Sequence, residues 1–358
     1  MAKSKTQDLL VKIELSSKEE IEGVKIPSAT DILKAGGHFG HSARRWHPAY
    51  KPFLYTKKKG IYIINAEKSV ESFKQAIKAL IDAVKQGKKV LLVGTKKQAS
   101  PLVKEFGEKY GVFYLTKKWP AGFFSNFEQI KASIDKLLVY KEQYIKRKYS
   151  LTKKELLDLE RKIQKLEDKY GGVTFMNQLP DLVIIIDIVF EKVALKEARL
   201  AKIPVLAIVD SNADPRLVEY PVLMNDDAIK ALQVFFTVLS DVFEKYGDKT
   251  LNNTRKNFNE HLAELEKEMD ATYGKAGPKV SKEKASAKSD DVEVVRVVAY
   301  TPIDDVKVLP KKLRESLKLA GIQSKEALER LSFEELVNIR GIGPRTARSI
   351  INKMKNLK

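Results

Sequence analysis

Short, uniformly apolar runs recur along the chain, and each is bounded by turn-forming residues. The runs KKVLLVG (88–94), DLVIIIDI (181–188) and IPVLAIVD (203–210) are rich in β-branched side chains. A strand with one solvated face would alternate apolar and polar positions, so these continuous runs indicate strands buried on both faces of a parallel sheet. The segments IYIIN (61–65) and VFYL (112–115) predict two further strands.

Between these runs, apolar side chains follow helical spacing. The segments 69–87 and 190–202 are amphipathic in this way. Two more helices are expected at 226–245 and 250–273, and the apolar face of the first would pack on the sheet. Strands that alternate with helices predict a doubly wound parallel α/β sheet with right-handed crossovers.

The segment 126–170 interrupts the alternation. Its apolar positions follow the three-and-four spacing of paired helices, and Thr152 with Glu155 forms a capping-box pattern where the second helix would begin. We therefore expect an inserted antiparallel coiled-coil hairpin. The cations near its turn suit either a solvated helix tip or a contact with RNA. They are Lys146, Arg147, Lys148, Lys153 and Lys154.

The apolar pattern is lost after residue 273. Residues 275–291 are rich in Lys, Ser and Ala, which is typical of a disordered linker. Short amphipathic segments with Gly-containing turns return from Leu309, which predicts a small all-α C-terminal domain. The expected organisation is thus an N-terminal extension (1–27), an α/β domain (28–273) with its hairpin at 126–170, a flexible linker (274–308) and a helical domain (309–358).

The charge of the chain points to a polyanionic partner. There are 66 Lys and Arg against 47 Asp and Glu, a formal net charge of +19. This excess is uneven, because residues 31–170 carry a net +17 whereas residues 171–270 carry a net −6. Phosphate attracts clustered cations, so we expect one face of the protein to bind nucleic acid and another face to avoid it.

Other features of composition restrict the cellular setting. No run of about 18 apolar residues suggests a membrane span, and the first residues have no apolar stretch typical of a signal peptide. The chain has no Cys, which excludes disulfides, zinc sites built on thiolates and a Cys nucleophile. A cytoplasmic protein without membrane contact is expected.

The segment HFGHSARRWHP (38–48) is a candidate RNA contact. Arg44 and Arg45 offer guanidinium groups to phosphates, and Trp46 can stack on a base, although simple burial of the indole is the alternative. The three histidines in this segment invite a metal interpretation. A metal site needs a converging set of ligands, which the local sequence does not supply, so no metal is expected.

Three further groups of lysines extend the predicted RNA-binding surface. Lys57, Lys58 and Lys59 precede a predicted strand, where a solvated loop is the alternative. Lys96 and Lys97 follow Gly94 at a strand-to-helix turn that can hold a phosphate of either RNA or a nucleotide. Lys117 and Lys118 begin KKWPAGFFSNF (117–127), which is either a second RNA contact or the hydrophobic base of the hairpin.

An enzyme of the same fold class is the main competing hypothesis. Neither a Walker phosphate loop nor the glycine-rich dinucleotide motif is present, so neither a catalytic residue nor a cofactor is assigned. Several Asp residues follow predicted strands, where α/β enzymes place their active sites. Caps of turns and helices explain them better, because no nucleophile or base motif accompanies them. These residues are Asp187, Asp210, Asp214, Asp226 and Asp227.

Six segments, in order, resemble the bacterial ribosomal protein S2 family. They are ILKAGGHFGHSARRWHP (32–48), VLLVGTKKQA (90–99), KWPAGFFSNF (118–127), LPDLVIIIDI (179–188), KEARLAKIPVLAIVDSNADP (196–215) and NDDAIKAL (225–232). The resemblance covers residues 28–245 and implies a flavodoxin-like domain with an inserted coiled coil. It further implies binding to small-subunit ribosomal RNA between head and body, contacts with neighbouring ribosomal proteins, and docking of the mRNA-binding protein S1 in many bacteria.

The chain departs from the family pattern in two places and extends beyond it at both ends. The family usually has Arg-Trp-Leu-Gly-Gly where this chain has Lys118-Trp119-Pro120-Ala121-Gly122, and usually Asn at the position of His47. A different local turn, with different contacts, is therefore expected at 120–122.

The C-terminal region resembles a helix-hairpin-helix module. Its turn would offer backbone amides at Gly341 and Gly343 to a phosphate, with added charge from Arg345 and Arg348. A packing role for the glycines is the alternative. This resemblance keeps a DNA-binding or repair protein open as a hypothesis beside the nucleotide-binding enzyme.

Overall fold

A computed structural model of the chain describes residues 10, 12–17, 19–248 and 250–273. The predicted linker and the predicted C-terminal helical domain, with Gly341, Gly343, Arg345 and Arg348, lie outside the described residues. Within the described part of the chain, no helix is both long and apolar enough to cross a membrane.

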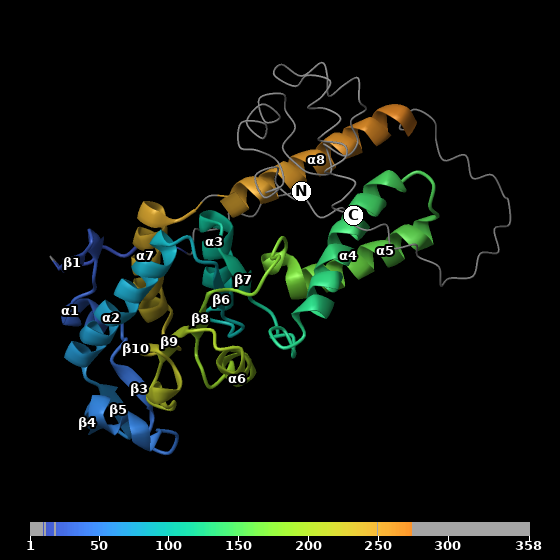
Figure 1. Cartoon of the computed structure of the whole chain (residues 1–358). Helices are drawn as coiled ribbons and strands as arrows, with labels where there is room; N and C mark the ends of the chain where they lie inside the picture. Colours follow the sequence, from blue (N-terminus) through green and yellow to red (C-terminus); the bar gives the residue numbers. More distant parts are fainter. Residues whose placement is uncertain (1–9, 11, 18, 249, 274–358) are drawn as a thin grey trace, which may run out of the picture. The chain divides into compact units, whose positions relative to one another are not determined.

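Five parallel strands form the central sheet (Figure 1). They are β6 (Val90–Val93), β7 (Phe113–Leu115), β8 (Leu182–Ile186), β9 (Val205–Val209) and β10 (Tyr220–Leu223). Their order in space is β10-β9-β8-β6-β7, with every neighbouring pair parallel. Counted along the chain, this is the flavodoxin-like order, which reverses between β6 and β8. The prediction of a doubly wound α/β sheet is confirmed.

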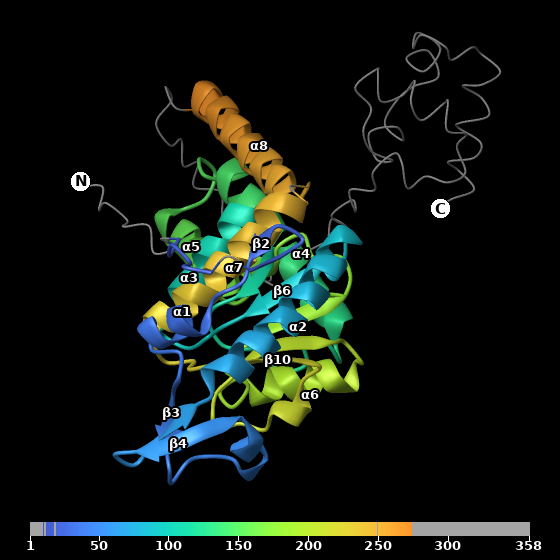
Figure 2. The same cartoon turned by 90° about the vertical axis from the view of Figure 1, so that its left-hand side faces the viewer.

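Alternate residues of the central strands point into two cores, one on each face of the sheet. Leu92 and Ile184 face one core, whereas Leu91 and Ile185 face the other. The first core is covered by α2, α3 and α7, and the second by α6 (Figure 2). Residues 119–124 also pack into the second core. Because both faces are covered, the strands are continuously apolar in sequence. The helices are α2 (Ala66–Lys85), α3 (Ser100–Tyr110), α6 (Lys192–Leu200) and α7 (Ile229–Tyr246).

A separate three-stranded antiparallel sheet, the small sheet, projects from the end of the α/β body away from α8 (Figures 1 and 2). Its strands are β3 (Phe39–Ser42), β4 (Leu54–Lys58) and β5 (Ile61–Ile64), in the order β3-β5-β4, and the 3-10 helix η1 (Pro48–Phe53) links β3 to β4. The predicted strand at 61–65 therefore exists, but outside the central sheet.

The small sheet is fixed to the carboxyl end of β9. The Tyr50 hydroxyl donates to the carbonyl oxygen of Val209 at 2.9 Å, and the His47 amide donates to that of Ser211 at 2.8 Å. A Cβ atom at Gly40 would clash with the Ser211 side chain, so this close approach requires glycine. The sheet thus has a defined position on the body.

The segment predicted as an N-terminal extension lies against the α/β body where it is described. Strands β1 (Glu20–Ile21) and β2 (Val24–Lys25) form a hairpin that is followed by α1 (Ala29–Lys34), which has a Ser28–Asp31 capping box. The Lys12 ammonium group pairs with Asp241 of α7 at 2.9 Å. Val24 and Ile26 are fully buried in the first core, so these residues contribute to the domain's stability.

Two helices, α4 (Phe127–Lys146) and α5 (Lys153–Tyr170), occupy the predicted hairpin. The capping box of Thr152 and Glu155 is present as predicted. An ion pair of 2.7 Å joins Lys141 to Glu167, and both residues lie near the carboxyl ends of their helices. A single ion pair at this position does not show the regular side-chain packing of a coiled coil. The antiparallel coiled-coil geometry stays a prediction. The 3-10 helices η2 (Gly171–Val173) and η3 (Pro215–Leu217) complete the connections.

Helix α8 (Thr250–Tyr273) joins the α/β body to the paired helices. At its start, Arg255 donates to the carbonyl oxygens of Gly107 at 3.0 Å and Gly172 at 2.9 Å. Near its end, Glu266 accepts from Lys148, in the turn after α4, at 2.9 Å. Helix α8 therefore contacts both parts at its two ends.

Candidate nucleic-acid interface

The turn between β4 and β5 presents three predicted RNA-binding residues at the tip of the small sheet. Lys59 and Gly60 have φ values of +48° and +79°, the backbone of a tight hairpin turn. Lys57, Lys58 and Lys59 are all exposed. The tip therefore directs three ammonium groups into solvent.

The predicted arginines lie beside this tip. The Ala43 amide donates to the carbonyl oxygen of Gly60 at 2.9 Å, which brings the turn after β3 alongside the lysines. Arg44 and Arg45, in that turn, are exposed. Among the described residues, neither arginine forms an ion pair, and the same holds for the three lysines at the tip. The small sheet thus gathers five cations that are free to meet phosphates.

Aromatic rings lie among these cations. Trp46 is half-buried, and its ring centroid is 5.0 Å from that of Tyr62 on β5. The Lys57 ammonium group lies 6.0 Å from the Tyr62 ring centroid. Tyr55 on β4, which the sequence analysis missed, is 75% exposed. Trp46 is thus partly accessible, and the surface around it has the mixture of rings and cations that suits RNA bases and phosphates.

A second group of predicted cations lies at the carboxyl ends of β6 and β7. Lys97 follows β6, Lys117 and Lys118 follow β7, and all three are exposed. The Ser100 hydroxyl donates to the carbonyl oxygen of Thr116 at 3.0 Å, which holds the two loops together. These lysines form a second basic patch at the same edge of the central sheet to which the small sheet is fixed.

The aromatic residues beside Lys118 serve the core. Trp119 is buried, as are Phe123 and Phe124. The Glu197 carboxylate on α6 accepts from the indole of Trp119 at 3.2 Å and from the amides of Gly122 and Phe124 at 2.7 and 3.0 Å. The hydrophobic-base interpretation therefore fits the rings of this segment, while its two lysines remain on the surface.

Lys96 was predicted to bind phosphate, but its geometry contradicts that role. Its ammonium group lies 2.6 Å from Asp227, 2.9 Å from Asp226 and 3.1 Å from Asp187. Burial would lower the pKa of Lys96, but the attraction of the three carboxylates outweighs burial and raises it. The charge is already neutralised within the protein, so Lys96 is removed from the predicted RNA-binding set.

A side chain of the protein also bonds a backbone amide of the turn that contains Lys96. The Thr95 amide donates to the Glu191 carboxylate at 2.8 Å, and Glu191 is buried. Burial raises the pKa of this carboxyl group. The predicted strand-to-helix turn is present, and helix α3 begins after it at Ser100. An internal carboxylate therefore bonds an amide of this turn, at the switch point of the sheet where flavodoxin-like folds bind ligands.

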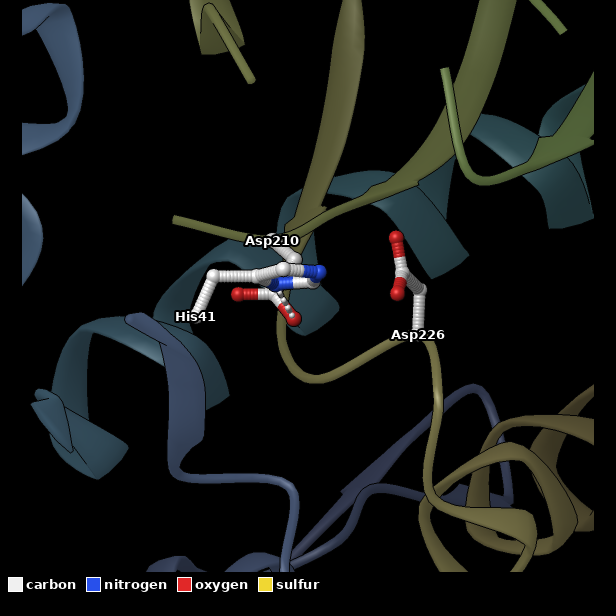
Figure 3. Close-up of side chains that lie close together, drawn as sticks. All are labelled: His41, Asp210 and Asp226. Atoms are coloured by element: carbon white, nitrogen blue, oxygen red, sulfur yellow. Dashed lines mark ion pairs between the residues drawn. The ribbon is translucent and has the colours of Figure 1, made fainter. Parts of the chain in front are cut away.

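His41, Asp210 and Asp226 come together beside this turn, as Figure 3 shows. The Nδ1 atom of His41 lies 3.0 Å from Oδ2 of Asp210, at ion-pair distance but without the alignment of a hydrogen bond. Contact with Asp210 raises the pKa of His41. Burial, together with Asp187 and Asp210, raises the pKa of Asp226 to about 7. The site therefore holds more buried negative charge than Lys96 can balance.

The ligand types in this cluster suit a divalent cation. One nitrogen of His41 and one oxygen from each of Asp210 and Asp226 all lie within 4.8 Å of one another. The three histidines of the 38–48 segment do not converge, because the Nδ1 atom of His47 instead accepts from the Ala49 amide at 3.2 Å. A histidine with two distant aspartates can thus hold a cation that the local sequence did not predict.

The capping interpretation of the aspartates is correct for two residues and wrong for two. Asp187 accepts from the amides of Val189 and Phe190 at 2.8 and 3.0 Å. Asp214 accepts from the Arg216 amide at 3.1 Å, as a cap does. Asp210 and Asp226 are each 1% exposed and belong to the buried cluster instead. Before α7, Asn225 caps the turn by accepting from the amides of Asp227 and Ala228 at 2.7 and 3.2 Å.

Comparison with known proteins agrees with this fold. Residues 32–245 match the family described as "Ribosomal protein S2". The chain is 40% identical over 263 residues to "Small ribosomal subunit protein uS2" of Campylobacter curvus, a match that spans 73% of this chain and 98% of the relative. The proteins of the same name from Campylobacter concisus and Campylobacter lari are 43% and 42% identical, over 60% and 61% of this chain and 82% and 84% of theirs. The chain therefore belongs to the ribosomal protein S2 family.

Proposed function

We propose that the chain binds small-subunit ribosomal RNA through the small sheet and supports translation as a structural component of the subunit. The observation that carries this proposal is the group of five exposed cations around the rings of Trp46 and Tyr62. None of the five is paired with another described residue, so binding a phosphate would not first require breaking an internal ion pair.

Family membership assigns the chain to the structural proteins of the bacterial cytoplasmic ribosome and not to enzymes. The turn at Thr95 agrees, because Glu191 fills the position that a nucleotide phosphate would need. The nucleotide-binding enzyme is therefore no longer a candidate. The DNA-binding hypothesis rests only on the C-terminal region, outside the described residues.

The partners within the subunit are proposed at two levels of detail. Ribosomal RNA and neighbouring ribosomal proteins follow from the family. A position between head and body, and docking of protein S1, stay predictions from the resemblance, as does a nucleic-acid contact by the C-terminal region. The second basic patch at Lys97, Lys117 and Lys118 is proposed as an additional RNA contact.

Two triple variants of equal charge test the RNA interface. Lys57, Lys58 and Lys59 are replaced by Ala in one, and Lys88, Lys104 and Lys109, which are exposed on the α2 and α3 side, are replaced in the other. Binding of a small-subunit rRNA transcript is measured from low to high salt. The tip variant should reduce the slope of log K against log salt by about 2, since each phosphate contact contributes about 0.7–0.9.

The control variant loses the same net charge, so it measures the non-specific part of the effect. Equal slopes and equal affinities for the two variants would contradict an interface at the small sheet. Incorporation of both variants into small subunits, followed by sedimentation, shows whether the same contacts operate during assembly.

A further inference from the structure

Helix α6 and the loop before it expose an unusual number of apolar side chains. Of the eleven large hydrophobic residues that are exposed in the described chain, four lie within this one segment. Leu200 is 73% exposed and Phe190 58%, and Val189 and Val193 are also exposed. A cluster of this kind on a folded domain marks a surface that another molecule covers.

A groove of about 590 Å³ runs beside these residues. Ile188, Leu195 and Leu217 line its apolar part, and Val189 and Leu200 extend the lining. Ile188 and Leu195 are buried members of the second core, so the floor is fixed by packing. The groove can therefore receive apolar side chains without rearrangement of the fold. We call this surface the α6 groove.

The polar lining of the α6 groove is positively charged. Lys192, Lys196 and Arg199 are exposed along it, and none of them pairs with an acidic group elsewhere in the described structure. The acidic residue of the lining, Asp214, is held by Arg216 through two contacts of 2.9 Å. Three uncompensated cations thus border an apolar floor, within a stretch of sequence that is acidic overall.

We propose that the α6 groove binds an acidic segment of a neighbouring small-subunit protein, with aliphatic or aromatic side chains inserted between the cations. This inference rests on the proposed function, because it requires the chain to be part of the subunit. Aliphatic side chains favour protein over RNA, since RNA is bound mainly through phosphates and stacked rings. Apolar residues beside Arg, with charge of one sign, are typical of a protein interface.

The absence of Cys from the sequence allows a direct test. The Leu200→Cys variant introduces a single thiol in the groove, and Leu157→Cys places one on α5, where Leu157 is likewise exposed. Both variants are assembled into small subunits. The rate of reaction with a small maleimide is then compared between the free protein and the subunit, and a short photo-crosslinker attached to the thiol identifies what lies beside it.

We expect assembly to slow maleimide labelling of Leu200→Cys by about tenfold or more, because a packed interface excludes solvent. The photo-crosslinked product should be a protein segment with a net negative charge. Replacing Lys192, Lys196 and Arg199 by Glu should then remove this crosslink while leaving the chain in the subunit. The crosslink to an acidic protein segment and its loss in the charge-reversed variant would together support the assignment. Labelling of Leu157→Cys measures how much assembly slows the reaction of a thiol outside the groove.

Three results would overturn the inference. They are an unchanged labelling rate in the subunit, a crosslink to RNA, and a protein crosslink that persists in the charge-reversed variant. Each of these leaves the RNA interface at the small sheet intact. Failure of the unmodified chain to enter small subunits would instead refute the proposed function, and the α6 groove assignment with it. If Leu200→Cys does not fold, Val189→Cys places the thiol within the same groove and allows the same measurements.

Discussion

The lysines at the tip of the small sheet and Lys96 at the carboxyl edge of the central sheet use the same residue type in opposite ways. At the tip of the small sheet, Lys57, Lys58 and Lys59 are exposed and have no acidic partner among the described residues. At the carboxyl edge, Lys96 is 14% exposed and lies among Asp187, Asp226 and Asp227. The lysines at the tip can contact a polyanion, whereas Lys96 already balances part of the negative charge of the buried carboxylates.

This difference shows that a basic motif in sequence does not establish an available charge. The pairs Lys96-Lys97 and Lys57-Lys58 look alike in sequence, yet only Lys96 is surrounded by carboxylates. The availability of a cation depends on which loops converge on it, and the order of the strands decides that. The following predictions test whether the two regions are as different as their geometry indicates.

The largest expected effect is on stability, at Lys96. The Lys96→Met variant keeps most of the side-chain volume but leaves the carboxylates of Asp187 and Asp226 without their cation. Removing one partner of a buried ion pair costs about 3–5 kcal/mol, and we expect a loss near the lower end of this range in the free energy of urea unfolding. The neighbouring Lys97→Met, at an exposed position, should change stability by less than about 0.5 kcal/mol. Similar losses in both variants would remove the distinction between the two regions.

Asp226 of the carboxylate cluster should make stability depend on pH. The pKa of Asp226 is raised from 3.8 to about 7, so the folded protein keeps this proton over a range in which the unfolded chain has released it. Stability is therefore expected to fall as pH rises through that window, with a slope of at most about 1.4 kcal/mol per pH unit. Asp226→Asn should flatten the profile in a chelator-containing buffer. A profile unchanged by this substitution would show that the cluster does not titrate in this way.

Addition of a divalent cation should stabilise the folded protein through the carboxylate cluster and not through the small sheet. If Zn²⁺ binds the ligands of His41, Asp210 and Asp226, a free concentration roughly 30 times its Kd stabilises the folded state by about 2 kcal/mol. We expect a corresponding rise in the thermal midpoint on Zn²⁺ addition and its reversal by a chelator. Asp210→Asn should abolish the rise, whereas Asp214→Asn, outside the cluster, should retain it. A rise that survives in Asp210→Asn would assign the binding to other residues.

The smallest expected effect concerns the rings of the small sheet. Trp46→Leu removes the indole without changing the charge, so the affinity for rRNA should fall by about 1 kcal/mol if a base stacks there. The salt dependence should remain that of the unmodified protein. Trp46→Phe should recover part of the affinity because it restores an aromatic face. A loss of affinity accompanied by a weaker salt slope would mean that the substitution had displaced the neighbouring cations instead.

The fold could be predicted from sequence where packing alone decides it. The runs that became β6, β8 and β9 are buried on both faces, and this produces an unbroken apolar sequence. Strand β10 was missed because it is a short run, YPVL, with a proline inside it. Strands β3 and β4 were missed as well, since the small sheet is largely exposed and has no apolar periodicity.

The carboxylate cluster could not be predicted in the same way, because its members are distant in sequence. His41 comes from the small sheet, Lys96 follows β6, and Asp210 follows β9. Parallel strands bring their carboxyl ends to one edge, so the positions of the aspartates after predicted strands were a usable signal. Capping was preferred for them because a short polar residue after a strand fits a turn equally well, and local sequence does not reveal what approaches from another loop.

The hydrogen bond between the Thr95 amide and Glu191 has a consequence for how the protein responds to its surroundings. A bound metabolite would stabilise the fold only in proportion to its concentration, through mass action. A carboxylate attached to the same chain is present at a fixed effective concentration. The hydrogen bond at this turn therefore forms with the fold itself and requires no ligand.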